Sequence, residues 1–104
     1  GIVFLGKEFP EGYRGTFLLT RFGNFFRSPK DNSGFDVLRA TLRRNAEGRY
    51  EGHFHTVLSG LGRPIDIHLG APGKLYIAEY SRATNSSDSY GPSGRILELS
   101  VAGR

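Results

Sequence analysis

Cysteine is absent from this 104-residue chain, and its aromatic residues are confined to phenylalanine and tyrosine. Without cysteine the chain forms no disulfide and offers no thiolate to a metal. Cysteine content therefore does not indicate whether the protein works in an oxidising or a reducing compartment. No apolar run approaches the roughly 20 residues that a membrane-spanning helix needs, so we expect no membrane span. No basic run interleaves with stacking aromatics, so we also expect no nucleic-acid partner, although the net charge is +4.

Glycine is abundant, with 15 residues, and it punctuates many short β-prone runs. This composition favours strands and turns over helices. The segment 37–44 has the strongest helical alternative, but Gly34 and Gly48 bracket it too closely. The pattern predicts seven strands, at residues 2–5, 16–22, 35–43, 49–58, 64–70, 74–81 and 94–100.

Two turn signals fix how neighbouring strands connect. Residues 45–48 read Asn-Ala-Glu-Gly, which is typical of a hairpin, and Pro72 with Gly73 marks a second tight turn. In the strand between Phe35 and Arg43 we expect Phe35, Val37, Ala40 and Leu42 to face inward.

The order of strands, four and then three, predicts an all-β fold of two antiparallel β-propeller blades. Residues 1–60 would form the first blade, and residues 61–104 a second blade that lacks its outermost strand. A blade cannot bury both of its faces alone. The remaining blades, from the same or another polypeptide, are therefore expected partners.

The residues also resemble a known family. The stretch 1–23, GIVFLGKEFPEGYRGTFLLTRFG, with 62–81, GRPIDIHLGAPGKLYIAEYS, and the closing GRILELS at 94–100, is similar to the C-terminal blades of soluble sugar dehydrogenases that use pyrroloquinoline quinone (PQQ). This is the glucose and sorbosone dehydrogenase group of six-bladed propellers. The resemblance implies an oxidoreductase that is periplasmic or extracellular.

The same resemblance implies where a cofactor would lie. Arg21 and Arg63 match positions near the quinone, so both are candidate cofactor-binding residues. The family's lysine contact falls at 22–24, which hold Phe, Gly and Asn, and Ile65 replaces a second arginine. The catalytic histidine and the calcium ligands belong to other blades, so no catalytic or metal-binding residue is assigned here and the chain is expected to be inactive alone.

Several polar residues have two interpretations each. Arg21 and Arg63 could clamp carboxylates in bidentate fashion, or form surface or inter-blade ion pairs. Asp66, between Ile65 and Ile67 on a strand expected to be well buried, could act as a base, but a structural role in tying strands together is favoured.

Two further groups could bind metals. His53 and His55 share one face of a strand, yet no third ligand follows at a suitable spacing, so solvated histidines on an outer strand are favoured. The oxygen-rich segment 85–90 matches no calcium-loop pattern, and a surface loop is the default reading.

Two functions remain open. The first is the C-terminal part of a quinone-dependent sugar dehydrogenase-like propeller. The second is a carbohydrate-binding or scaffold propeller assembled from several short chains, a homo-oligomer in which Tyr13, Tyr80 and Tyr90 could contact sugar.

Overall fold

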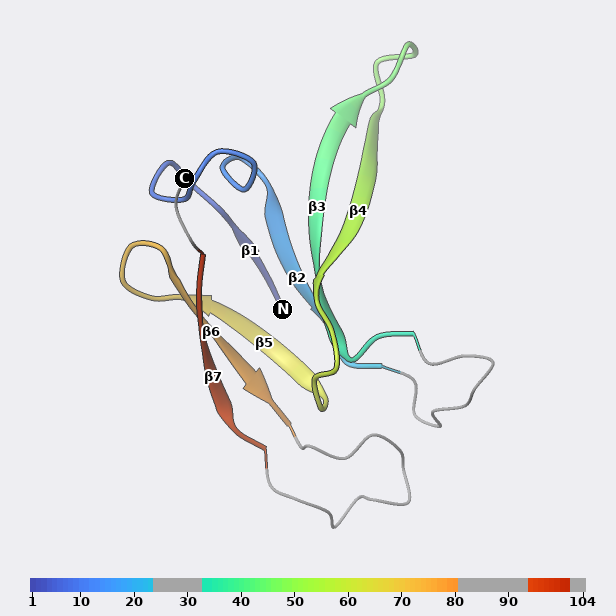
Figure 1. Cartoon of the computed structure of the whole chain (residues 1–104). Helices are drawn as coiled ribbons and strands as arrows, with labels where there is room; N and C mark the ends of the chain where they lie inside the picture. The colour runs from blue at the N-terminus through green and yellow to red at the C-terminus, as the bar shows by residue number, and fades with distance from the viewer. Residues whose placement is uncertain (24–32, 81–93, 102–104) are drawn as a thin grey trace.

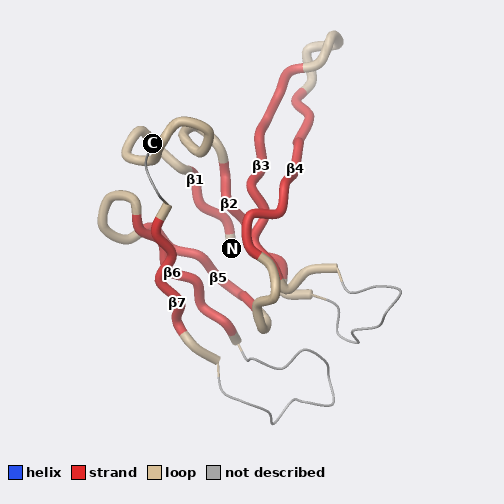
Figure 2. Tube along the Cα trace, in the orientation of Figure 1, coloured by secondary structure: helices blue, strands red, loops and turns tan. Residues whose placement is uncertain are grey.

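The computed structural model describes residues 1–23, 33–80 and 94–101, and every regular element in these ranges is a strand. Figure 2 shows this all-β composition along the trace. The strands are β1 (Ile2–Phe4), β2 (Phe17–Arg21), β3 (Asp36–Arg44), β4 (Tyr50–Leu58), β5 (Pro64–Leu69), β6 (Lys74–Glu79) and β7 (Ile96–Ser100). The prediction of seven strands is confirmed, with ends that differ from the expected ones by at most two residues.

The strands form two separate antiparallel sheets. The first has the order β1-β2-β3-β4 and the second has the order β5-β6-β7. In Figure 1 the two sheets diverge, with β3 and β4 on one side and β6 and β7 on the other. The fold is therefore all-β with two open sheets.

The inner faces of the two sheets enclose one hydrophobic core. Eight buried apolar residues form it, and they come from both sheets and from the segments beside them: Leu5, Phe9, Leu18, Val37, Leu61, Ile67, Leu75 and Ile77. Alternation along each strand explains which strand residues are buried in this core, because every second side chain of a strand points to the same face. In β6, for example, Leu75 and Ile77 point into the core.

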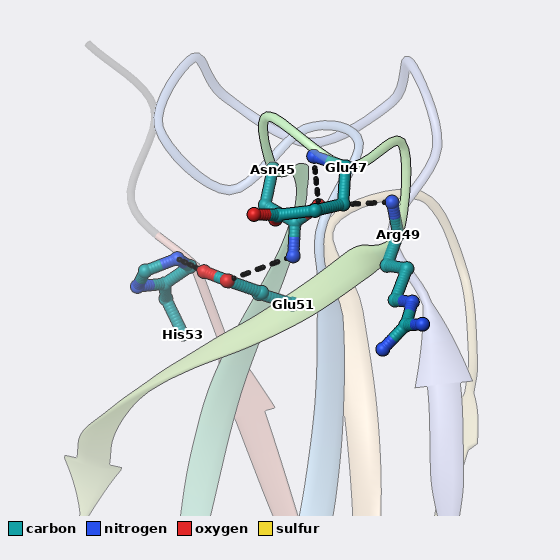
Figure 3. Close-up of polar contacts among 5 residues, drawn as sticks. All are labelled: Asn45, Glu47, Arg49, Glu51 and His53. Carbon is teal, nitrogen blue, oxygen red and sulfur yellow. Dashed lines mark hydrogen bonds and ion pairs between the residues drawn. The ribbon is translucent and has the colours of Figure 1, made fainter.

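Turns close the sheets where the sequence contains glycine. Gly48 and Gly73 both have positive φ, at 79° and 81°, and each lies in one of the two predicted tight turns. At the first turn the Asn45 side chain accepts hydrogen bonds from the backbone N–H groups of Glu47 and Arg49. This local pattern holds the hairpin between β3 and β4 (Figure 3).

The hairpin of β3 and β4 extends beyond the rest of its sheet. Both strands have nine residues, whereas β1 and β2 have three and five, and Figure 1 shows the hairpin projecting past its neighbours. Phe35 and Val37 are buried as expected. The inward expectation was wrong for Ala40, which is buried but pairs with Phe17 and Phe54 on the sheet face opposite to Val37. It was also wrong for Leu42, which shares that outer face and is 53% exposed, because β2 pairs with β3 only as far as Ala40.

Asp66 also differs from expectation. Its strand was expected to be well buried, but Asp66 is exposed and Ile65 is 47% exposed, while Ile67 is buried. The reason is that Asp66 pairs with Ala78 on the face of the second sheet opposite to the core residues Ile67 and Ile77. The Asp66 carboxylate accepts a hydrogen bond from the backbone N–H of Ile67, so its described contact is local and does not tie two strands together.

Candidate functional site at the common end of the two sheets

Arg21 and Asp36 mark one end of the first sheet. Arg21 is the last residue of β2, Asp36 is the first residue of β3, and the two are register partners. The guanidinium binds the carboxylate in bidentate fashion, with Nε to Oδ1 at 2.8 Å and Nη2 to Oδ2 at 2.7 Å. The pair thus tethers the open ends of β2 and β3.

The electrostatics of this pair are asymmetric. The Asp36 side chain is buried, whereas the Arg21 side chain is 40% exposed. The hydrogen bond to Asp36 raises the pKa of Arg21 above its usual value, against a smaller opposing effect of desolvation. Arg21 therefore carries a fixed positive charge with one edge held by protein and part of its surface reachable from solvent.

Arg63 lies at the corresponding end of the second sheet, just before β5 begins. It is only 5% exposed. Its guanidinium carbon is 4.8 Å from the centre of the Phe22 ring and 4.9 Å from that of Phe35. Two aromatic rings, one just after β2 and one just before β3, thus cover an arginine that precedes the second sheet. Such cation–π contacts strengthen when they are desolvated.

Backbone hydrogen bonds reinforce this same end. The N–H of Leu61, in the segment between the sheets, donates to the Phe35 carbonyl beside β3 at 3.0 Å. Within the second sheet, the N–H of Tyr80 donates to the Arg63 carbonyl at 2.7 Å. Phe35 has φ of 57°, in the left-handed region that is unusual for a large side chain. That conformation is held by the packing of its ring beside Arg63, by the bond from Leu61 and by donation of the Phe35 N–H to the Arg21 carbonyl at 3.0 Å.

Glu79 is a site residue that the sequence interpretation missed. Its side chain is fully buried at the end of β6, where one carboxylate oxygen accepts from Arg95 Nε and the other from the Gly62 N–H at 2.6 Å. A signal for it existed, because Glu79 continues the alternation of Leu75 and Ile77 and so points inward. The carboxylate fixes both the segment before β5 and the start of β7.

An open hollow of about 470 Å³ borders Arg21. Its described lining combines backbone and small polar groups with the ion pair, and consists of Arg21, Ser33, Gly34, Phe35, Asp36, Thr56, Ser59 and Gly60. A hollow of this size is in the range that holds small ligands. Arg63 is not among these lining residues, so the structure brings the two predicted arginines to one end of the molecule without placing both in one hollow.

The remaining candidates are dispersed. His53 Nε2 lies 3.8 Å from Glu51 on the projecting hairpin (Figure 3), and His55 is exposed. Within the described residues no group of three His, Cys, Asp or Glu side chains could hold a metal ion. The segment 85–90, with Tyr90, lies outside the described residues.

Comparisons with protein-family models, with curated proteins and with solved structures give no match to this chain. Among the described residues, no helix has the length and apolar character needed to cross a membrane.

Proposed function

We propose that this chain is the C-terminal part of a β-propeller similar to the soluble quinone-dependent sugar dehydrogenases. In this role the two sheets are neighbouring blades, and they supply part of the wall of a central mouth. The observation that carries the proposal is the gathering of Arg21 and Arg63 at the common end of two sheets that share a core. The propeller family and the quinone cofactor are taken from the sequence resemblance.

The residues fit a tricarboxylate cofactor in part. Arg21 borders the hollow and keeps part of its surface exposed, so it can bind a ligand carboxylate while Asp36 holds its orientation. Arg63 is covered by Phe22 and Phe35, so direct contact with a ligand requires Phe22, which is 40% exposed, to move. In the proposed role Arg21 binds and orients the anion, and Arg63 positions the two rings.

PQQ, when bound in a complete propeller, accepts the hydride that leaves the sugar. The base that takes the accompanying proton, and the calcium ligands, would come from the other blades. The chain alone is therefore proposed to bind without oxidising sugar.

Titration of the full chain with PQQ, followed by absorbance, tests this role. Saturable binding that Arg21→Ala weakens and Arg43→Ala leaves unchanged is expected, because Arg43 lies on the projecting hairpin. Absence of saturable binding, or equal loss in both variants, contradicts the proposal.

A second candidate function is a carbohydrate-binding or scaffold ring built from several copies of this chain. It is favoured by the outer face of the first sheet, where Ile2, Phe4 and Phe54 are all more than half exposed. A sheet that is apolar on both faces is normally covered on both. Tyr80 is also exposed and could contact sugar in such a ring.

The two candidates differ in solution mass. A ring raises the mass above the 11.5 kDa of one chain as concentration rises, and Phe4→Glu returns it to that of one chain. A single-chain mass at every concentration contradicts the second candidate and leaves the first intact.

A further inference from the structure

The second sheet is one strand narrower than the first, and this leaves part of the first sheet uncovered. His55 pairs with Arg39, which in turn pairs with the core residue Leu18, so all three lie on the inner face of the first sheet. His55 is nevertheless exposed. The second sheet ends at β7, and no described strand lies beyond it to cover β4.

At the free edge of β7, the backbone groups of alternate residues have no partner among residues 1–23, 33–80 and 94–101. The N–H of Glu79 donates to the Arg95 carbonyl, and the N–H of Val101 donates to the Gly73 carbonyl, so the odd-numbered residues of this strand bond toward β6. In an antiparallel ladder the intervening residues point the other way. The N–H and C=O groups of Ile96, Glu98 and Ser100 therefore line the free edge.

This edge lacks the devices that usually prevent strand pairing. Such devices are proline, bulges and charged side chains at the edge. The sequence of β7 is Ile-Leu-Glu-Leu-Ser, and it pairs with β6 without a bulge. Its one charged residue, Glu98, is bound by Lys74 and Tyr76 of β6, each at 3.1 Å, so it is held toward the sheet and away from the edge.

A hollow beside β7 continues the core between the sheets. It has a volume of about 200 Å³ and a mostly apolar lining that includes Tyr13, Leu18, Val57, Leu99 and Val101. Four of these residues pack against the core cluster and Leu18 belongs to it. The hollow is thus an extension of the existing interface between the sheets at the edge where the second sheet ends.

We propose that the edge of β7 accepts one extended peptide segment as a fourth antiparallel strand of the second sheet. The main-chain bonds come from Ile96, Glu98 and Ser100. The segment has alternating character: apolar side chains beside Leu97 and Leu99 fill the hollow, and polar side chains lie on the opposite face. This inference does not depend on quinone binding, because it rests only on the width of the sheets and the state of the edge.

The probe is an eight-residue peptide of alternating threonine and valine, N-methylated at each valine so that it pairs only through the N–H groups of its threonines, with the valines on the face of Leu97 and Leu99. The control peptide is N-methylated at each threonine as well. Binding to the full chain is followed by fluorescence anisotropy, and amide hydrogen exchange is measured in parallel. The probe is expected to bind and to slow exchange at Ile96, Glu98 and Ser100, with little change at Leu97 and Leu99.

Two variants make the test specific. Ser100→Pro removes one outward N–H without disturbing a bond to β6, and it should weaken probe binding by about tenfold, the worth of one hydrogen bond. Ser100→Thr keeps the N–H and should bind as the natural chain does. Equal binding by the proline variant, binding of the fully methylated peptide, or no binding of the probe overturns the proposal. Protection of the same three amides without peptide, in a species of doubled mass, overturns it in favour of pairing between two copies through β7.

Discussion

Arg21 and Asp36 face each other across the last paired position of β2 and β3, joined by two hydrogen bonds of 2.8 and 2.7 Å. The aspartate is buried and the arginine is partly exposed. One side of this ion pair therefore stabilises the fold, while the other side borders an open hollow. In the candidate site, buried Asp36 therefore orients Arg21, and the exposed part of Arg21 is available to a ligand.

Asp36→Asn tests the structural half of the pair. The substitution removes the charge that holds the guanidinium while keeping the side-chain volume, so it should lower the free energy of unfolding by about 1–3 kcal/mol, as expected for lost hydrogen bonds to a charged group. Urea denaturation measures this change. An unchanged midpoint would show that the pair contributes nothing to stability.

Glu79→Gln should destabilise the chain more than Glu98→Gln. Glu79 is buried and binds both Arg95 and the Gly62 N–H, whereas Glu98 is an exposed partner of Lys74. Because Arg95 is half exposed, the expected cost is that of lost hydrogen bonds to a buried charged group, about 1.5–3 kcal/mol. Glu98→Gln serves as the matched control and should leave the urea midpoint close to that of the natural chain. Equal effects of the two substitutions would contradict the assignment of Glu79 as a buried anchor.

The Glu98 carboxyl should titrate below the usual range of glutamate. Hydrogen bonds first from Lys74 and then from Tyr76 lower its pKa. A lowered folded-state pKa means that the contribution of the pair to stability is present above the unfolded-state pKa and is lost as the pH falls through the folded-state pKa. A side-chain NMR titration measures this value, and Lys74→Met should raise it; a pKa that Lys74→Met leaves unmoved would contradict the contact.

Gly34→Ala and Gly60→Ala separate two costs of replacing glycine. Both residues have positive φ, at 93° and 74°. A Cβ at Gly34 would lie 2.3 Å from the Gly23 Cα, whereas a Cβ at Gly60 meets nothing within 4 Å. Gly60→Ala should cost about 1 kcal/mol from backbone strain alone. Gly34→Ala should cost clearly more in thermal unfolding, because two backbone segments must move apart; equal costs would mean that residues 23 and 34 do not approach closely.

The sequence predicted the strands well because their signals are local. Alternating apolar residues and the turns at Gly48 and Gly73 set the number and approximate ends of all seven strands. Ala40 and Leu42 were placed wrongly because strict alternation from Val37 puts both of them on the opposite face of β3, so the spacing of apolar residues did not identify the core face. The expected burial of Asp66 failed for the same reason, since alternation with the core residue Ile67 places Asp66 on the outer face.

The candidate site was less predictable than the strands. The resemblance selected Arg21 and Arg63, and both lie at the common end of the sheets. Their partners depend on contacts between distant parts of the chain, namely Asp36 for Arg21 and the rings of Phe22 and Phe35 for Arg63. One sequence does not specify such pairings, so the quinone role stays a prediction.

The account depends most on the two sheets behaving as one unit with a common core, since the candidate site is assembled from the ends of both. Native-state amide hydrogen exchange of Ile77→Ala tests this directly, with Leu18 of β2 and Leu75 of β6 as reporters. The substitution should lower the opening free energy at both residues by the same amount, about 2–4 kcal/mol. A loss confined to Leu75, with Leu18 unchanged, would contradict the common core and with it the site.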